Sequence, residues 1–252
     1  MKMSNDSKRV RERLELSLPV RVQCRESADY EWVELTRLVD VTPFGARFSI
    51  ARPTETGRLL HLTLPMPRQL RCFDHVEQQY RVWALVRNVK SMAQAEKDKL
   101  PRFEIGVAFI GKHPPASFQT DPAKRYEVAS SATESGLWDV REQPDEAAKY
   151  ARTDAPRHET RHAMAIDVAV EVFDDKGVVT TSEQTVTENI SRRGAAVFTT
   201  LEVERGRFVR LTSSRYQIAV VAAVRARRLG PDNIPRLHLE FVDKQWPLED
   251  AS

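Results

Sequence analysis

The chain has 252 residues, which is enough for one large domain or for two domains of ordinary size. Its 39 Lys and Arg residues against 36 Asp and Glu residues leave a net charge of only +3, and this narrow surplus argues against a nucleic-acid partner. Two cysteines, no apolar leader and no run of about 18 apolar residues exclude a disulfide scaffold and a membrane-spanning helix. We therefore expect a cytoplasmic protein with reduced thiols and no membrane insertion.

The first half of the chain consists mainly of short runs in which apolar and polar residues alternate. They predict strands at 18–22, 32–39, 46–50, 59–64, 81–89 and 103–110. Segments 65–79 and 91–100 have no counterpart later in the chain, and we interpret both as hairpin elaborations of unknown role. The first domain is predicted to span residues 1–113.

Residues 114–155 are rich in Pro, Ser, Thr, Asp and Glu and predict a linker. Trp138 lies inside it, and we expect this ring to pin the linker onto a neighbouring domain, because burying a Trp side chain contributes kilocalories. Residues 156–252 are predicted to form the second domain. Its strands are expected at 165–173, 184–188, 195–199, 208–211, 217–227 and 236–242. Six short strands in each half favour a small antiparallel barrel or sandwich.

One two-part motif occurs once in each half. It reads RxxxR and then [DN]x[ST]xxG, with 27 positions from residue 13 to residue 40 and 28 positions from residue 161 to residue 189. The first copy consists of Arg9, Arg13, Asp40, Thr42 and Gly45, and the second of Arg157, Arg161, Asn189, Ser191 and Gly194. The motif and the strands follow the same order in both halves, which predicts a tandem repeat of one fold.

At these residues the chain resembles the PilZ family, whose members bind the bacterial second messenger cyclic di-GMP. The resemblance covers residues 7–112 and 156–243, and the only departure from the motif is Thr42 in place of serine. It implies a mainly all-β fold of two tandem PilZ-like antiparallel β-barrels, each of about six strands, with short helical elements and the RxxxR segment folded over the barrel mouth. It also implies a receptor that takes cyclic di-GMP as its ligand and needs no cofactor or metal.

The ten motif residues suit that ligand chemically. A guanidinium group can pair bidentately with a phosphate or with guanine O6 and N7, and it can stack on a base. The carboxylate of Asp40 or the amide oxygen of Asn189 can accept from guanine N1–H and N2–H2. Thr42 and Ser191 offer a small hydroxyl to the base or phosphate. Glycine permits a positive φ and close approach of the ligand to the turn.

Two other functions compete with this interpretation. Residues 158–162 spell HExxH, the motif of zinc-dependent hydrolases, but that motif needs a helix, whereas Pro156 and a strand-like run flank it here. A DNA-binding transcription regulator is suggested by the basic side chains of Arg205, Arg207, Arg210 and residues 225–228. Arginines of this kind more often form the solvated face of strands. No Ser-His-Asp, Cys-His or phosphate-loop arrangement is present, so we predict a receptor and not an enzyme.

The position of the second arginine pair predicts how the signal is passed on. Arg157 and Arg161 lie where the linker enters the second domain, so a ligand that holds them should reorient what precedes them. We expect cyclic di-GMP to change the arrangement of the two domains or to create a surface for a downstream protein partner. The sequence does not identify that partner.

Overall fold

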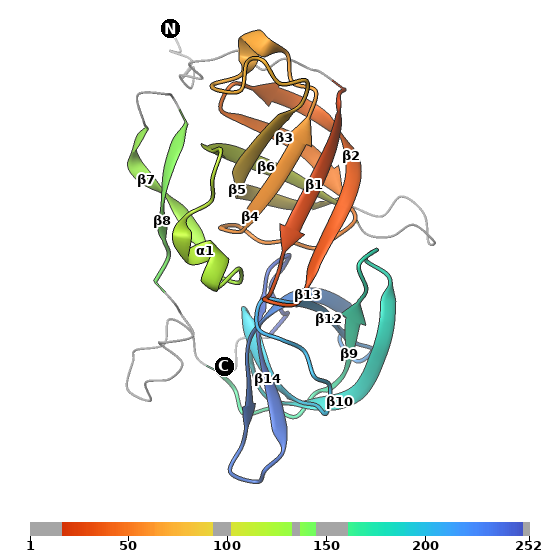
Figure 1. Cartoon of the computed structure of the whole chain (residues 1–252). Helices are drawn as coiled ribbons and strands as arrows, with labels where there is room; N and C mark the ends of the chain where they lie inside the picture. The colour runs from red at the N-terminus through yellow and green to blue at the C-terminus, as the bar shows by residue number, and fades with distance from the viewer. Residues whose placement is uncertain (1–16, 93–101, 133–136, 145–160, 249–252) are drawn as a thin grey trace, which may run out of the picture.

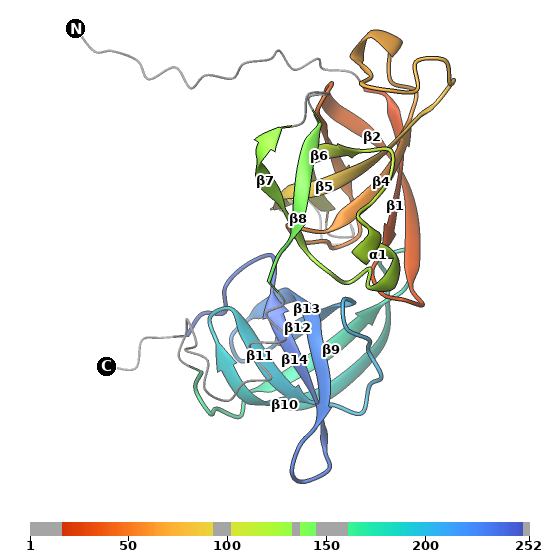
Figure 2. The ribbon, with the colours of Figure 1, turned by 60° about the vertical axis from the view of Figure 1, so that its left-hand side comes forward.

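The computed structural model describes residues 17–92, 102–132, 137–144 and 161–248, and it contains two closed six-stranded barrels. The prediction of two mainly antiparallel β-barrels is confirmed. Figures 1 and 2 show the barrels stacked one on the other. The first consists of β1 (Pro19–Arg25), β2 (Glu31–Thr42), β3 (Gly45–Ile50), β4 (Leu59–Leu64), β5 (Tyr80–Met92) and β6 (Arg102–Gly111). The second consists of β9 (Asp167–Phe173), β10 (Val179–Ser191), β11 (Gly194–Phe198), β12 (Phe208–Ser213), β13 (Ile218–Leu229) and β14 (Pro235–Phe241).

The two barrels have the same topology. The strand order is β1-β2-β3-β6-β5-β4 in the first, and the second closes in the corresponding order β9-β10-β11-β14-β13-β12. Alternation along each strand places apolar side chains inside, as in β1, where Val20, Val22 and Cys24 are buried while Arg21 and Gln23 face outward. The repeat seen in the sequence is therefore a repeat of the fold.

The loops peculiar to the first half lie in hairpins. Residues 65–79 connect β4 to β5, which pair directly, and include a short 3-10 turn at Arg68–Leu70. The buried guanidinium of Arg71 donates to the main-chain carbonyls of Met66, Asp74, Glu77 and Gln78, and so organises this loop from within. Most of segment 91–100 lies outside the described residues.

The segment between the barrels contains regular structure of its own. It forms the helix α1 (Ala116–Thr120) and a two-stranded sheet of β7 (Tyr126–Ala132) and β8 (Trp138–Glu142), both beside the first barrel (Figures 1 and 2). Phe118 and Tyr126 pack against Leu59 and Leu85. Leu137, which is 7% exposed, joins the barrel core, whereas Trp138 is 37% exposed. The expectation that Trp138 pins this segment is therefore wrong, since its apolar neighbour does so. No helix in the described parts of the chain is long and apolar enough to cross a membrane.

A polar interface joins the two barrels. Glu55 of the first barrel, which is 4% exposed, forms a two-pronged ion pair with Arg225 on β13. Arg58 donates to the carbonyl oxygen of Gly206 at 2.6 Å. The guanidinium of Arg207 lies 3.2 Å from the ring centroid of Tyr30. Phe208, Val221 and Ala223 from the second barrel complete the apolar cluster of the first. The barrels thus share buried charge as well as buried apolar surface.

Candidate functional site

The [DN]x[ST]xxG residues form a tight strand-to-strand turn in both barrels. In the second barrel the turn joins β10 to β11, and the Ser191 hydroxyl accepts from the Arg193 N–H and donates to the Gly194 carbonyl, both at 3.3 Å. In the first barrel Thr42 does the same with the Phe44 N–H at 3.2 Å and the Gly45 carbonyl at 3.3 Å. Because threonine supplies the same hydroxyl, its replacement of serine preserves the turn.

The glycine of each motif is required for a different reason from the one predicted. Neither Gly45 nor Gly194 has a positive φ, so that expectation is wrong. A Cβ on Gly194 would instead collide with the main-chain carbonyl of Leu239 on β14, and a Cβ on Gly45 with that of Val107 on β6. Glycine is present because the neighbouring strand approaches the turn closely.

The two halves of the second motif copy meet in space. Arg161 Nη1 donates to Asn189 Oδ1 at 3.1 Å. The next residue, His162, pairs with Ile190 through two main-chain hydrogen bonds, of 2.8 Å from the His162 N–H and 3.0 Å from the Ile190 N–H. The end of the RxxxR segment therefore lies along the last residues of β10. Arg157 lies outside the described residues.

The register of the sheet continues this site across the outside of the second barrel. Asn189 pairs with Ala196, and Ala196 pairs with His238 on β14. Burial lowers the pKa of His238, and the positive charges of Arg228 and Arg161 lower it further, so the imidazole is neutral at pH 7. His238 and Arg228 are absent from the motif. The only sequence signal for His238 is its period-two position on β14, the last strand of the barrel.

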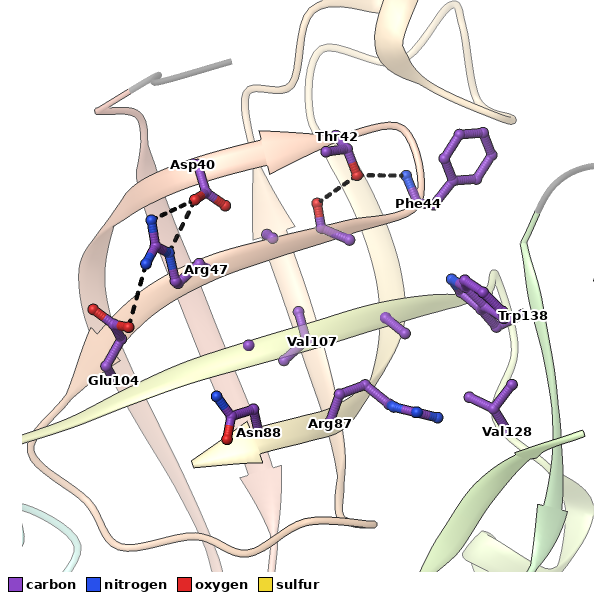
Figure 3. A pocket seen from close by; sticks show the side chains of 14 residues that line it. Asp40, Thr42, Phe44, Arg47, Arg87, Asn88, Glu104, Val107, Val128 and Trp138 are labelled. Carbon is purple, nitrogen blue, oxygen red and sulfur yellow. Dashed lines mark hydrogen bonds and ion pairs between the residues drawn. The ribbon is translucent and has the colours of Figure 1, made fainter. Parts of the chain in front are cut away.

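The first barrel has a different side chain at the centre of the corresponding row. Asp40 pairs with Arg47, which occupies the position of Ala196. Arg47 donates to Asp40 Oδ2 from Nε at 2.9 Å and from Nη2 at 2.7 Å, and its Nη1 lies 3.4 Å from Glu104 (Figure 3). These contacts raise the pKa of Arg47 above its usual range. The structure thus brings Asp40, Thr42 and Gly45 to one face, whereas Arg9 and Arg13 lie outside the described residues.

A hollow of about 500 Å³ adjoins these first-barrel residues. It extends from Asp40 and Glu104 at one end to Arg87 and Trp138 at the other (Figure 3). Sequence reasoning had assigned Trp138 to a packing role and had not singled out Arg47 or Arg87 for the site. The hairpin that brings Trp138 to this face lies in the predicted linker, so no sequence pattern connected it with the motif.

The geometry disfavours both competing functions. His162 lies in an extended bridge to β10 and not on a helix, whereas the zinc-hydrolase motif requires a helix; His158 and Glu159 lie outside the described residues. Within the described ranges, no group of His, Cys, Asp and Glu side chains is arranged to hold a metal ion. Four of the arginines that suggested a DNA-binding face form ion pairs with carboxylates of the protein, namely Arg205, Arg207, Arg210 and Arg225.

A comparison with protein families finds a match for the second barrel. The model of the PilZ domain family matches residues 153–246, whereas no curated protein matches the sequence. Among solved structures, the Bacillus subtilis inhibitor of motility MotI/DgrA is 16% identical with a TM-score of 0.30, over 92% of this chain and 90% of that chain. The Borreliella burgdorferi PlzA protein in complex with c-di-GMP is 7% identical with a TM-score of 0.27, over 91% and 86%.

YcgR from Escherichia coli, solved in complex with c-di-GMP, is 9% identical with a TM-score of 0.28, over 90% of this chain and 76% of that chain. Identities and TM-scores this low carry no argument about the site. The family match bears on the site, because the matched residues include the barrel, the Arg161–Asn189 contact and the turn at Gly194. The second barrel, within residues 153–246, is thus the part of the chain that matches the PilZ domain family.

Proposed function

We propose that the PilZ domain of this chain binds cyclic di-GMP and that the protein acts as a receptor for this messenger, and not as an enzyme. The observation that carries the proposal is the contact between Arg161 and Asn189, which places the end of one half-motif on the turn formed by the other. A guanidinium group and an amide side by side provide donors for phosphate or guanine O6 and N7, and an acceptor for guanine N1–H and N2–H2.

Each motif residue of the second barrel receives a specific role. Arg157 and Arg161 bind the phosphates and guanine edges, and Asn189 presents its amide to the base. Ser191 holds the turn through its two main-chain hydrogen bonds, and Gly194 allows β14 to pass close to it. Thus Ser191 and Gly194 contribute mainly by fixing the position of Asn189.

The electrostatic surroundings support an anionic ligand. Arg228 and Arg161 both lower the pKa of His238, so positive charge lies near this imidazole and favours its neutral form. A neutral imidazole can donate from one ring nitrogen and accept at the other, which suits a nucleotide better than a second fixed charge would. We assign His238 as a further contact of the ligand.

The experiment is calorimetric titration of the full chain with cyclic di-GMP. In Arg161→Ala, loss of charge-assisted contacts of about 1.5–3 kcal/mol each should weaken binding at the second site at least tenfold. Arg215→Ala is the matched control, because Arg215 is an exposed arginine of the same barrel that contacts only the face of Tyr216 among the described residues. Unchanged binding by Arg161→Ala, or an equal loss in Arg215→Ala, would contradict the assignment.

We infer further that binding changes how the barrels sit on each other or how a downstream protein contacts them. What supports this is the polar interface, in which Arg225 on β13 holds both Glu55 of the first barrel and Glu240 on β14. A ligand shifts such an arrangement only if it binds one state more tightly, typically by about 1–3 kcal/mol for coupled sites. Small-angle scattering at saturating cyclic di-GMP should show a changed profile. Identical profiles would mean that the barrels do not rearrange. The signal would then have to pass through a surface formed at the ligand itself.

A further inference from the structure

The hollow on the first barrel has a flat floor of small residues. Gly45 on β3 pairs with Ala108 on β6, and the outward-facing position next to Ala108 on β6 is Gly106. None of these residues projects a side chain larger than a methyl group, so the outer face of the sheet is open where they meet. The volume of about 500 Å³ lies within the range of about 300–1,000 Å³ that is common for small-molecule sites.

The wall of the hollow at one end is an exposed aromatic ring. Trp138 on β8 is 37% exposed, whereas Trp32 and Trp246 are 2% and 1% exposed, and Trp83 is half-buried. The position of the Trp138 ring is fixed, because Leu137 is buried in the barrel core and β8 pairs with β7. A positioned ring that keeps a third of its surface in water at the edge of a cavity is suited to stack on a planar ligand.

A cation at the same end has no partner among the residues that the structure describes. Arg87 on β5 is exposed and lines the hollow (Figure 3), and among the described residues it makes no hydrogen bond or ion pair. The arginine at the corresponding place in the second barrel is Arg225, which is 6% exposed and bound to Glu55 and Glu240. Arg87 is therefore available to a ligand, whereas its counterpart supports the structure.

The opposite end of the hollow is acidic. Asp40 and Glu104 contribute two carboxylates against the single guanidinium of Arg47. Among the described residues Glu104 makes a single long polar side-chain contact, of 3.4 Å with Arg47, so it keeps acceptor capacity toward the hollow. Carboxylates attract the donor-rich edge of guanine, which carries N1–H and N2–H2, and repel phosphate. The phosphate of a nucleotide in the hollow would therefore lie at the Arg87 end.

We propose that Trp138 and Arg87 extend the predicted first-barrel site into this hollow, where the guanine base stacks on Trp138, directs its donor edge toward Asp40 and Glu104, and places its phosphate near Arg87. The proposal rests on the function proposed above, because the ligand is again cyclic di-GMP. It adds contacts from β5 and from the β7–β8 hairpin that the RxxxR and [DN]x[ST]xxG motif does not contain. In the described part of the chain, the only two-stranded sheet beside a barrel is β7–β8 at the first one (Figure 1), so the two sites differ in construction.

The test uses the full chain carrying Arg161→Ala, so that the second site is weakened and the first is observed. Cyclic di-GMP should change the tryptophan fluorescence of this chain, because Trp138 is the most exposed of the four tryptophans. Adding Trp138→Ala should weaken the remaining calorimetric binding at least about fivefold, because it removes the stacking of one base on an aromatic ring. Trp138→Phe keeps an aromatic ring and should retain most of the binding. Cyclic di-AMP, which lacks the donor edge of guanine, should bind more weakly at this site.

Asp139→Ala is the control on the same strand, since Asp139 is exposed and does not line the hollow. Melting temperatures show whether each variant is folded. If Arg161→Ala abolishes all binding and Trp138→Ala binds like the wild type, the extension of the site is refuted while the proposed function stands. If the wild-type chain binds no cyclic di-GMP, both are refuted. Equal losses in Trp138→Ala and Asp139→Ala would also refute the extension of the site.

Discussion

Glu55 is the carboxylate on which the contact between the barrels depends, and its removal gives the sharpest test of the interface. Arg58 Nε donates to Glu55 Oε1 at 2.9 Å, and Arg225 binds both of its oxygens. The side chains of these two arginines are only 1% and 7% exposed, so Glu55→Ala leaves two buried cations without their main counter-ion. Water cannot solvate them without opening the interface.

The size of the loss follows from the remaining contacts. Removing one partner of a buried ion pair costs about 3–5 kcal/mol. Arg225 keeps Glu240 at 2.6 Å, and Arg58 keeps the carbonyl oxygens of Glu26, Pro122 and Gly206, so we expect the lower end, about 3 kcal/mol. In a chain of 252 residues, about 2–4 °C of melting temperature per kcal/mol gives a fall of about 6–12 °C.

The assay is thermal denaturation of the wild type, Glu55→Ala and a control. The control is Glu127→Ala, which breaks the ion pair of 2.7 Å with Arg141 between side chains that are 40% and 71% exposed. Exposed pairs contribute little, so this variant should melt like the wild type. A melting temperature of Glu55→Ala within about a degree of the wild type would show that the buried arginines do not need this carboxylate, and the account of the interface would fail.

Three further predictions concern the same barrels. Burial alone would raise the pKa of Glu55, but Arg225 and Arg58 lower it from 4.5 to about 2. The contribution of Glu55 to stability is therefore complete above pH 4.5 and is lost as the pH falls toward 2. Unfolding of Glu55→Gln, measured as a function of pH, should lack this loss. Gly194→Ala should destabilise the chain by about 1–3 kcal/mol in denaturant unfolding, because its Cβ meets a strand carbonyl, whereas Gly106→Ala meets only Asn88 Cβ at 3.7 Å and should cost less. Arg47→Ala should strengthen calorimetric binding of cyclic di-GMP in the Arg161→Ala background, because it removes the cation that competes for Asp40 and enlarges the hollow; weaker binding would show that Arg47 itself holds the ligand.

The fold was predictable because the information lies in local alternation. Strands such as β1 have one face in the core, so period-two patterning marks them, and the repeated order of elements marks the two barrels. Strand ends were harder. β10 begins at Val179, several residues before the predicted strand at 184–188, because its first part is mostly exposed and shows no apolar face. The β7–β8 hairpin was missed because only scattered residues such as Leu137 are buried there.

For the candidate site, the sequence could predict the motif residues but not their neighbours on adjacent strands. The motif spacing singled out Arg161 and Asn189, and the structure brings them together. The motif spacing could not show which side chains lie beside these two residues on the sheet, because that depends on the register of the strands. Register shifts just before Asn189 in β10 and just before Asp40 in β2 decide that Ala196 and Arg47 face these residues. A shift of the strand pairing by one residue would put different side chains opposite the motif. The sequence pattern alone does not determine this register.

The outer faces of the two barrels have diverged in a way that connects each site to the interface. In the first barrel, Ala108 leaves the hollow open, whereas the second barrel has Glu240 at the corresponding position, where it holds Arg225 against Glu55. His238 and Glu240 lie on the same face of β14, one beside the Asn189 row and the other in the interface. A ligand that draws on His238 therefore acts on the strand that carries an interface carboxylate. A ligand in the first hollow contacts the β7–β8 hairpin instead, and Arg125, directly before β7, lies 3.5 Å from the same Glu240 carboxylate. Ligand at either site is thus positioned to alter how the barrels meet, provided that it binds one arrangement more tightly than the other.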